Sequence, residues 1–245
     1  LQRRARACHR RQQLPDTAAM YHNEDSVGQA IRESDVPRDE VFVTTKLWTD
    51  DQGYDSALRA FDASMEQLGL ETLDLYLIHW PTHPDRRMGS WRALERLYNE
   101  GRVRAIGVSN YLTQHLDELL AEAEIRPAVN QIELHAYNFA SRQQTVTMCR
   151  ENEIAITAYS PIARASNLDD PRLMAIAEKY ERTPAQILLR WLVQQDIIVI
   201  PKSTHRERIA ENGALFDFEL NDSDMQALRQ LDESLVTTAN PERIP

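Results

Sequence analysis

Short apolar segments alternate with longer amphipathic ones along most of the chain. The apolar segments are almost uninterrupted, as expected of strands buried on both faces of a parallel sheet. These predicted strands are VFVTT (41–45), DLYLI (74–78), RAIGV (104–108), VNQIE (129–133), AITAY (155–159) and IIVI (197–200). The intervening segments have helical periodicity, and we predict helices near 24–33, 55–68, 90–99, 113–122, 141–151, 171–180 and 183–193.

This alternation predicts repeated βα units with parallel strands. Two architectures fit such units: an open doubly wound sheet and a closed barrel. The doubly wound dinucleotide binders need a glycine-rich phosphate turn, but this chain has seven glycines and no GxGxxG arrangement. The pattern therefore favours a (β/α)8 barrel, and without a linker or a composition shift after residue 16 we predict a single domain over residues 1–245.

The start of the chain departs from this pattern. Residues 1–13 contain five arginines and no acidic residue, and Pro15 lacks the N–H that an interior strand would donate. We therefore expect only a weak strand before Asp16 and a barrel that is incomplete at its N-terminus. Two explanations stay open: residues 1–13 are out-of-frame or mis-started translation, or the chain is truly shortened and folds with help from another copy.

The overall composition limits the classes of molecule that this protein could bind and the compartment in which it could work. The net charge of −10 argues against nucleic acid, and no apolar run is long enough to suggest a membrane span. Cys8 and Cys149 have no metal or redox spacing, which favours a reducing cytoplasm and no metal site. We expect a cytoplasmic monomer acting on a small molecule.

Residues capable of chemistry follow nearly every predicted strand or its weak counterpart. They are Asp16, Lys46, His79, Ser109, Asn110, Gln131, Tyr159 and Lys202. Because the carboxyl ends of the strands of such a barrel open on one face, these residues can meet there. Each alone has an ordinary structural interpretation, such as a helix cap for Asp16, but the series favours an active site.

Four of the residues, Asp16, Tyr21, Lys46 and His79, belong to successive units and can converge. A phenol is a weak acid at neutral pH, but a nearby ammonium favours the phenolate and so makes proton donation easier. Asp16 would hold Lys46 in place and charged, and Lys46 would activate Tyr21. His79 could then hydrogen-bond a carbonyl oxygen and orient the substrate.

The segment PKSTHRERIAEN follows the last predicted strand, where barrels of this type often bind phosphate. Lys202 and Arg208 supply positive charge, Ser203 and Thr204 supply donors, and a helix N-terminus adds its dipole. These features predict an anion site.

The motifs as a set resemble those of the aldo-keto reductases over residues 16 to about 233. They are DTAAMYHNEDSVGQAI, TTKLW, LDLYLIHWP, GRVRAIGVSNY, PAVNQIELH, AYSPIA and VIPKSTHRERIAEN. Within the family the chain looks most like bacterial 2,5-diketo-D-gluconate reductases. The resemblance implies an NADPH-dependent carbonyl reductase on a (β/α)8 barrel that lacks its first βα unit.

The resemblance also implies individual roles. Tyr21 would be the general acid, Lys46 its activator, Asp16 the anchor of Lys46, and His79 the group that orients the carbonyl. Trp80 would form part of the substrate wall. The implied NADP(H)-binding residues are Ser109, Asn110 and Gln131 at the carboxamide, Tyr159 stacked on the nicotinamide with Ser160 beside it, Lys202, Ser203, Thr204 and Arg208 at the 2′-phosphate, and Glu211 and Asn212 at the adenine.

Two other functions stay open. One is an impaired member of the family that binds NADP(H) without turnover. The other uses Lys46 as a Schiff-base lysine in an aldolase-like barrel. The second does not account for Ser109 and Asn110 or for the basic segment after the last strand.

Overall fold

The structure, a computed structural model, describes residues 14–238 and divides into two compact units. The first unit covers residues 14–130 of the described chain and the second covers residues 131–238. Strand β4 (Val129–Glu133) carries the chain from one to the other. The single-domain organisation stays a prediction, and the atypical segment 1–13 lies outside the described residues.

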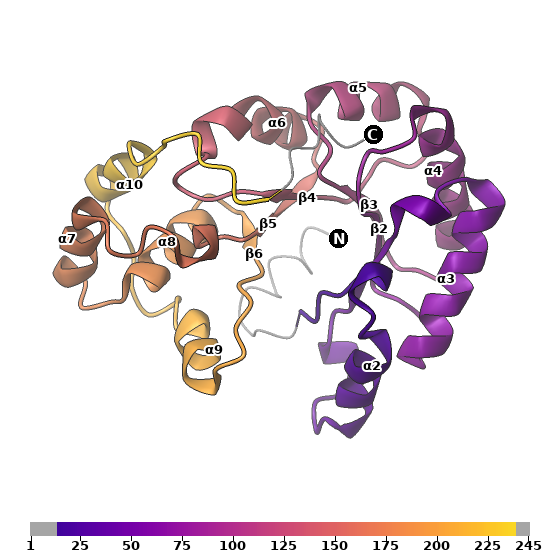
Figure 1. Cartoon of the computed structure of the whole chain (residues 1–245), viewed down its shortest axis with the longest axis horizontal. Helices are drawn as coiled ribbons and strands as arrows, with labels where there is room; N and C mark the ends of the chain where they lie inside the picture. Colours follow the sequence, from indigo (N-terminus) through magenta and orange to yellow (C-terminus); the bar gives the residue numbers. More distant parts are fainter. Residues whose placement is uncertain (1–13, 239–245) are drawn as a thin grey trace. The chain divides into compact units, whose positions relative to one another are not determined.

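The first unit contains three parallel strands and the helices that follow them (Figure 1). The strands are β1 (Thr44–Leu47), β2 (Leu75–Ile78) and β3 (Ile106–Ser109). The helices are α2 (Glu24–Glu33), α3 (Tyr54–Leu68), α4 (Pro84–Asn99) and α5 (Thr113–Glu122), with single 3₁₀ turns η1 (Ala19–Tyr21), η2 (Arg38–Glu40) and η3 (Thr49–Asp51). Lys46 lies opposite Leu77, and Leu77 opposite Gly107, so the three strands are in register and their carboxyl ends share one edge.

Of the weak strand predicted before Asp16, the structure describes residues 14 and 15, and these belong to no strand. Asp16 makes an isolated parallel bridge with Thr44. Thr44 donates its N–H to the Pro15 carbonyl and accepts from the N–H of Thr17, both at 2.9 Å. Pro15 takes part in the bridge through its carbonyl alone, so its lack of an N–H does no harm. The bridge places Asp16 beside β1.

Helices α2, α3 and α4 pack in sequence, α2 on α3 and α3 on α4. The buried strand side chains Leu75, Leu77 and Ile78 form part of the core. Gly28 permits the closest approach of α2 to α3, because a Cβ there would lie 2.1 Å from the carbonyl oxygen of Leu68. A substitution at Gly28 would push α2 away and shift Tyr21, which precedes it.

The second unit contains the parallel strands β5 (Ala155–Tyr159) and β6 (Ile198–Val199), in which Thr157 lies opposite Ile198. Its helices are α6 (Phe139–Glu151), α7 (Pro171–Lys179), α8 (Pro184–Val193), α9 (Arg206–Gly213) and α10 (Asp222–Arg229), with the 3₁₀ turn η4 (Ala163–Ala165) (Figure 1). Helix α8 is the central helix, since it contacts α7, α9, α10 and β6. Thr183 caps it and Pro184 occupies its first turn.

Several predicted boundaries were wrong. Helix α4 begins at Pro84, although its apolar periodicity pointed to a start near residue 90. Its first turns carry mostly polar side chains, and Pro84 at the first helical position after His83, with φ 50°, sets the true start. Strand β1 covers 44–47 rather than 41–45, and β6 is only two residues long. Helix α10 was missed because it is a short polar surface helix.

The longest helix of residues 14–238 is α4, with 16 residues. No helix in that range is both long enough and apolar enough to cross a bilayer.

Candidate active site

Lys46 and Asp16 form the centre of the site in the first unit. Lys46 is fully buried and donates to Asp16 Oδ1 at 2.5 Å and to the Thr17 carbonyl at 2.9 Å. A buried ammonium is stable only when it is paired and hydrogen-bonded. The parallel bridge at Asp16 supplies both partners, so the fold fixes the amine at one point.

Tyr21 lies beside this amine. It ends the 3₁₀ turn η1, and its N–H donates to the Ala18 carbonyl at 2.9 Å. The centroid of its ring is 5.2 Å from Lys46 Nζ and 5.7 Å from the centroid of the His79 ring, which it meets at 84°. Tyr21 is 47% exposed, so a molecule arriving from solvent can reach the phenol while the ammonium behind it stays buried.

His79 follows β2 and is buried between two indole rings. Trp48 meets it edge-on at 5.4 Å, and Trp80 is stacked at 6.3 Å with an interplanar angle of 19°. Burial, and after it the charge of Lys46, lowers the pKa of His79 to about 3. The imidazole is therefore neutral at physiological pH. Its Nδ1 atom is buried and has no hydrogen-bond partner among the described residues.

Two predicted cofactor residues connect directly to this cluster. Ser109 ends β3 and Asn110 follows it with φ 64°, and both are buried. The Asn110 amide donates to the His79 carbonyl at 3.0 Å and to Ser109 Oγ at 3.1 Å. The structure thus brings together seven predicted residues of the first unit: Asp16, Tyr21, Lys46, His79, Trp80, Ser109 and Asn110.

The predicted nicotinamide residues of the second unit lie in the middle of β4 and at the end of β5. Gln131 is buried within β4, and Tyr159 closes β5 with its side chain half-buried. The Tyr159 hydroxyl is 3.0 Å from Thr238 Oγ1. Ser160, the next residue, has φ 49°, so the chain turns sharply after the tyrosine.

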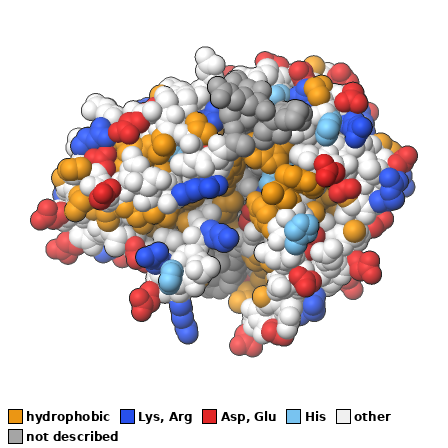
Figure 2. Space-filling view, in the orientation of Figure 1, with side chains coloured by type: hydrophobic (Ala, Val, Ile, Leu, Met, Phe, Trp, Pro, Cys, Tyr) orange, Lys and Arg blue, Asp and Glu red, His pale blue; other side chains and the backbone are white. Residues whose placement is uncertain are grey.

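The predicted phosphate segment follows β6 and leads into α9. Lys202, Thr204 and Arg208 are exposed, and Figure 2 shows basic side chains gathered over the region of α9. Ser203 Oγ accepts from the His205 N–H at 3.1 Å. Neither Lys202 nor Arg208 forms an ion pair with another residue of 14–238, so their charges are available to an anion.

The two predicted adenine residues are more enclosed. Glu211 Oε1 accepts from Thr183 Oγ1 at 2.5 Å, which ties α9 to the cap of α8, and Asn212 is buried. Glu211 therefore has a structural partner in addition to its predicted role.

Sequence reasoning missed Trp48, whose ring contacts His79. A signal for it existed: Trp48 follows Lys46 by two residues, so it leaves the strand on the same face. We add it to Trp80 as a candidate wall of the substrate site.

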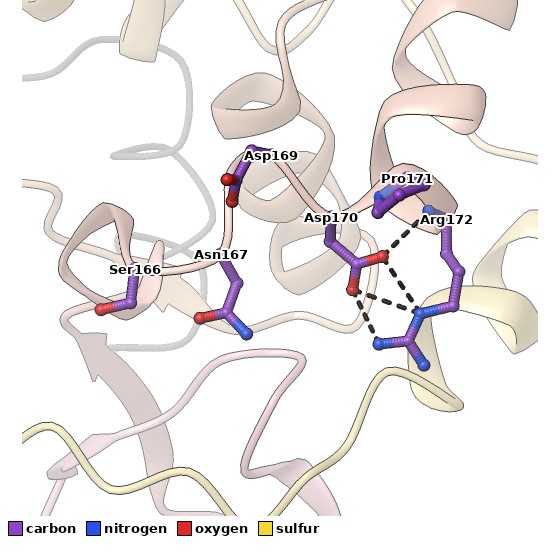
Figure 3. Close-up of a pocket in the computed structure, with 6 residues that line it drawn as sticks. All are labelled: Ser166, Asn167, Asp169, Asp170, Pro171 and Arg172. Carbon is purple, nitrogen blue, oxygen red and sulfur yellow. Dashed lines mark hydrogen bonds and ion pairs between the residues drawn. The ribbon is translucent and has the colours of Figure 1, made fainter.

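The second unit also has a surface pocket lined by Ser166, Asn167, Asp169, Asp170, Pro171 and Arg172 (Figure 3). Asp170 caps α7 through the Arg172 N–H and accepts from the Arg172 guanidinium at 2.7 Å. The hydrogen bonds from Arg172 lower the pKa of the Asp170 carboxyl. Since these groups bind one another and the pocket contains no predicted site residue, we interpret it as a helix start. Among residues 14–238 no cluster of His, Cys, Asp or Glu has the arrangement of metal ligands.

The first unit brings a buried ammonium, a phenol and a neutral imidazole close together beside its parallel strands, an arrangement that suits proton donation to a carbonyl group. It points to the class of barrel oxidoreductases that act on carbonyl groups. Comparison with known proteins gives the family, because residues 5–233 match the Aldo/keto reductase family. The chain belongs to this family.

Similar proteins support the assignment. The glyoxal reductase of Bacillus subtilis (strain 168) is 46% identical over 229 residues, which are 94% of this chain and 82% of that protein. A solved complex of a Gox0644 mutant with NADPH is 40% identical, with a TM-score of 0.88 over 95% of this chain and 84% of the other. A putative 2,5-diketo-D-gluconic acid reductase B is 36% identical, with a TM-score of 0.88 over 94% and 82% of the two chains. These likenesses confirm the predicted (β/α)8 fold class and the predicted resemblance.

Proposed function

We propose that this protein reduces aldehydes and ketones, such as small dicarbonyls and keto sugars, to alcohols with NADPH, and that Tyr21 is the general acid. The observation that carries the proposal is the cluster around Lys46, in which the buried amine is bound to Asp16 and faces the ring of Tyr21 at 5.2 Å. A relative named a glyoxal reductase supports the substrate class, and the similar Gox0644 mutant solved in complex with NADPH supports the cofactor.

The cluster can lower the barrier to carbonyl reduction through charge. When the Tyr21 hydroxyl gives its proton to a carbonyl oxygen, negative charge grows on the phenolic oxygen. The Lys46 ammonium stabilises this charge, and Asp16 keeps the ammonium fixed before the reaction begins. No reorganisation of the pair is then needed during the step.

His79 would orient the substrate. A neutral imidazole keeps one N–H donor and one acceptor nitrogen, so it can hydrogen-bond a carbonyl oxygen without competing with Tyr21 as an acid. Trp48 and Trp80 hold its ring from two sides and would present an apolar wall to the rest of the substrate.

The residues present suit NADPH. When bound, the cofactor supplies the hydride that the carbonyl carbon accepts. Ser109, Asn110 and Gln131 would bind its carboxamide, and Tyr159, with Ser160 beside it, would contact the ring. The 2′-phosphate would bind Lys202, Ser203, Thr204 and Arg208, among which the two basic residues have no ion-pair partner within residues 14–238, and the adenine would contact Glu211 and Asn212.

The test is NADPH oxidation, followed by absorbance, against a panel of glyoxal, methylglyoxal, aromatic aldehydes and keto sugars. Binding of NADPH is measured alongside by quenching of tryptophan fluorescence. We expect turnover with at least one carbonyl. Binding without turnover on any member would instead support an impaired NADP(H)-binding protein, and a covalent adduct at Lys46 trapped by borohydride would support the aldolase-like mechanism. The cytoplasmic location and the monomeric state stay predictions.

A further inference from the structure

Glu133 is a buried carboxylate that the proposed mechanism does not use. It ends β4, two residues after Gln131, and is 3% exposed. Within residues 14–238 no lysine or arginine pairs with it. A carboxylate buried without a cation is costly unless hydrogen bonds satisfy its oxygens.

The C-terminal strap, defined as residues 232–238, satisfies them. Glu133 Oε1 accepts from the N–H of Thr237 at 2.7 Å and from the Thr237 hydroxyl at 2.5 Å. Its Oε2 accepts from the Thr238 hydroxyl at 2.5 Å, and His135 Nε2 lies 3.4 Å from Oε1. Burial alone would raise the pKa of Glu133, but these hydrogen bonds from His135, Thr237 and Thr238 lower it to about 2. The group is therefore ionised and can only accept.

Other contacts hold the strap on the same unit. The N–H groups of Glu233 and Leu235 both donate to the Tyr137 carbonyl, at 3.0 and 2.9 Å. Asp232 accepts from the Ala140 N–H at the start of α6, and Glu233 pairs with Arg172, the arginine shown in Figure 3. These contacts attach the strap to the unit without Glu133. We therefore expect the hydrogen bonds from Thr237 and Thr238 to Glu133 to serve a purpose besides attaching the strap.

The hydrogen bond between Thr238 and Tyr159 has a definite direction. A threonine hydroxyl has one proton, and the one on Thr238 is directed to the ionised Glu133. Thr238 Oγ1 keeps its lone pairs for the Tyr159 hydroxyl, 3.0 Å away, and can accept from it. The result is a one-way chain from Tyr159 through Thr238 to Glu133.

We propose that Glu133 is a positioning residue for the cofactor: through the Thr238 hydroxyl it holds the Tyr159 hydroxyl and so fixes the position of the ring against which the nicotinamide binds. This inference rests on the proposed role of Tyr159. A tyrosine side chain turns about two torsions, and a hydroxyl held by a carboxylate-anchored partner restricts the first of them, which sets the direction in which the ring points. Pre-ordering the ring lowers the entropy that cofactor binding would otherwise cost.

The experiment measures NADPH affinity and the steady-state kcat and KM for the protein and a set of matched variants. Thr238→Val removes the middle hydroxyl and keeps the side-chain shape, Tyr159→Phe removes only the donor, and Thr238→Ser keeps the hydroxyl. Thr237→Val is the control, because Thr237 also binds Glu133 but does not touch Tyr159.

We expect Thr238→Val and Tyr159→Phe each to raise the Kd for NADPH by about 3- to 10-fold, consistent with a neutral hydrogen bond. The double variant Thr238→Val/Tyr159→Phe should lose no more NADPH affinity than either single variant, since both changes break the same hydrogen-bond chain. Thr238→Ser should retain the affinity of the parent, and Thr237→Val should stay within about twofold while lowering thermal stability.

The outcomes separate this inference from the proposed function. If Thr237→Val weakens NADPH as much as Thr238→Val, or if the two losses at Thr238 and Tyr159 simply add, Glu133 only anchors the strap and the inference fails. If Tyr159→Ala leaves NADPH affinity unchanged, the assigned role of Tyr159 is wrong, whatever Thr238 does. If Thr238→Val does not fold, Tyr159→Phe and Thr238→Ser still test the inference. Loss of NADPH affinity in Tyr159→Phe together with retained affinity in Thr238→Ser supports the hydrogen-bond chain.

Discussion

The cluster around Lys46 and the segment 202–212 are both built to carry charge, yet they do so in opposite ways. In the cluster, the ammonium is fully buried and bound to Asp16 and to a backbone carbonyl. In the segment, Lys202 and Arg208 are exposed and make no ion pair within residues 14–238. A catalytic charge must be fixed before the substrate arrives, whereas a binding charge gains its partner from the ligand. The difference fits the proposed roles, chemistry for the cluster and recognition for the segment.

The sharpest way to break this comparison is Tyr21→Phe. Removing the phenolic proton should lower kcat by about 10²- to 10⁴-fold, the usual contribution of general acid catalysis. The Kd for NADPH should change by less than about twofold, because no contact of Tyr21 with the cofactor is proposed. Stopped-flow or steady-state NADPH oxidation measures the first value, and fluorescence titration the second.

Tyr98→Phe serves as the control, since Tyr98 is also a partly exposed tyrosine but lies on α4. If Tyr21→Phe retained its turnover, Tyr21 would not be the general acid, and another group would have to donate the proton.

The next test concerns stability and uses the pKa of His79. Its folded value is about 3, below the ordinary value of 6.5, so the unfolded chain binds a proton that the folded chain does not. Stability is full above about pH 6.5 and falls as the pH drops towards 3, by about 1.4 kcal/mol per pH unit. His79→Gln cannot titrate and should lack this slope.

Urea unfolding of the two proteins at a series of pH values from 7.5 to 4.5 measures the difference. Curves that run parallel would show that His79 is protonated in the folded protein, and the neutral imidazole of the proposed mechanism would then be excluded.

Much of the parallel sheet could be predicted from sequence, because its strands are short and largely apolar. The segments 129–133 and 155–159 match β4 and β5 at both ends. The errors have physical causes. The start of α4 carries no apolar periodicity, and the contact of Trp48 with His79 depends on packing between two strands that periodicity cannot show.

The strap was harder to foresee. Nothing in the spacing of Glu133, Thr237 and Thr238, about a hundred residues apart, marks them as partners. Such pairings follow from the folded chain and not from local pattern. The roles of the site residues stay predictions until variants are measured.

The double change Lys202→Ala and Arg208→Ala tests the role of the exposed charges in the segment 202–212. Loss of two charge-assisted contacts to the 2′-phosphate should raise the Kd for NADPH by roughly 10- to 100-fold. The Kd for NADH, which has no such phosphate, should change by less than about threefold. Arg206→Ala is the control, as it removes an equally exposed charge from the same segment. Equal losses for both cofactors would mean that the phosphate binds elsewhere.

The smallest expected effect comes from Thr183, because this residue gives an internal partner to Glu211 in the largely exposed segment 202–212. Its hydroxyl caps α8 and also donates to Glu211, so one residue of the exposed segment is held internally. Thr183→Ala should lower the free energy of unfolding by about 1 kcal/mol, the usual value of a helix cap, and Thr183→Ser should restore it. If Glu211 is held for the adenine, Thr183→Ala should also weaken NADPH and NADH alike, because both carry adenine. Chemical denaturation and titration with the two cofactors separate these effects: a stability loss without any change in affinity would make the contact purely structural, and the segment would then bind its ligand entirely through groups that the fold leaves unpaired.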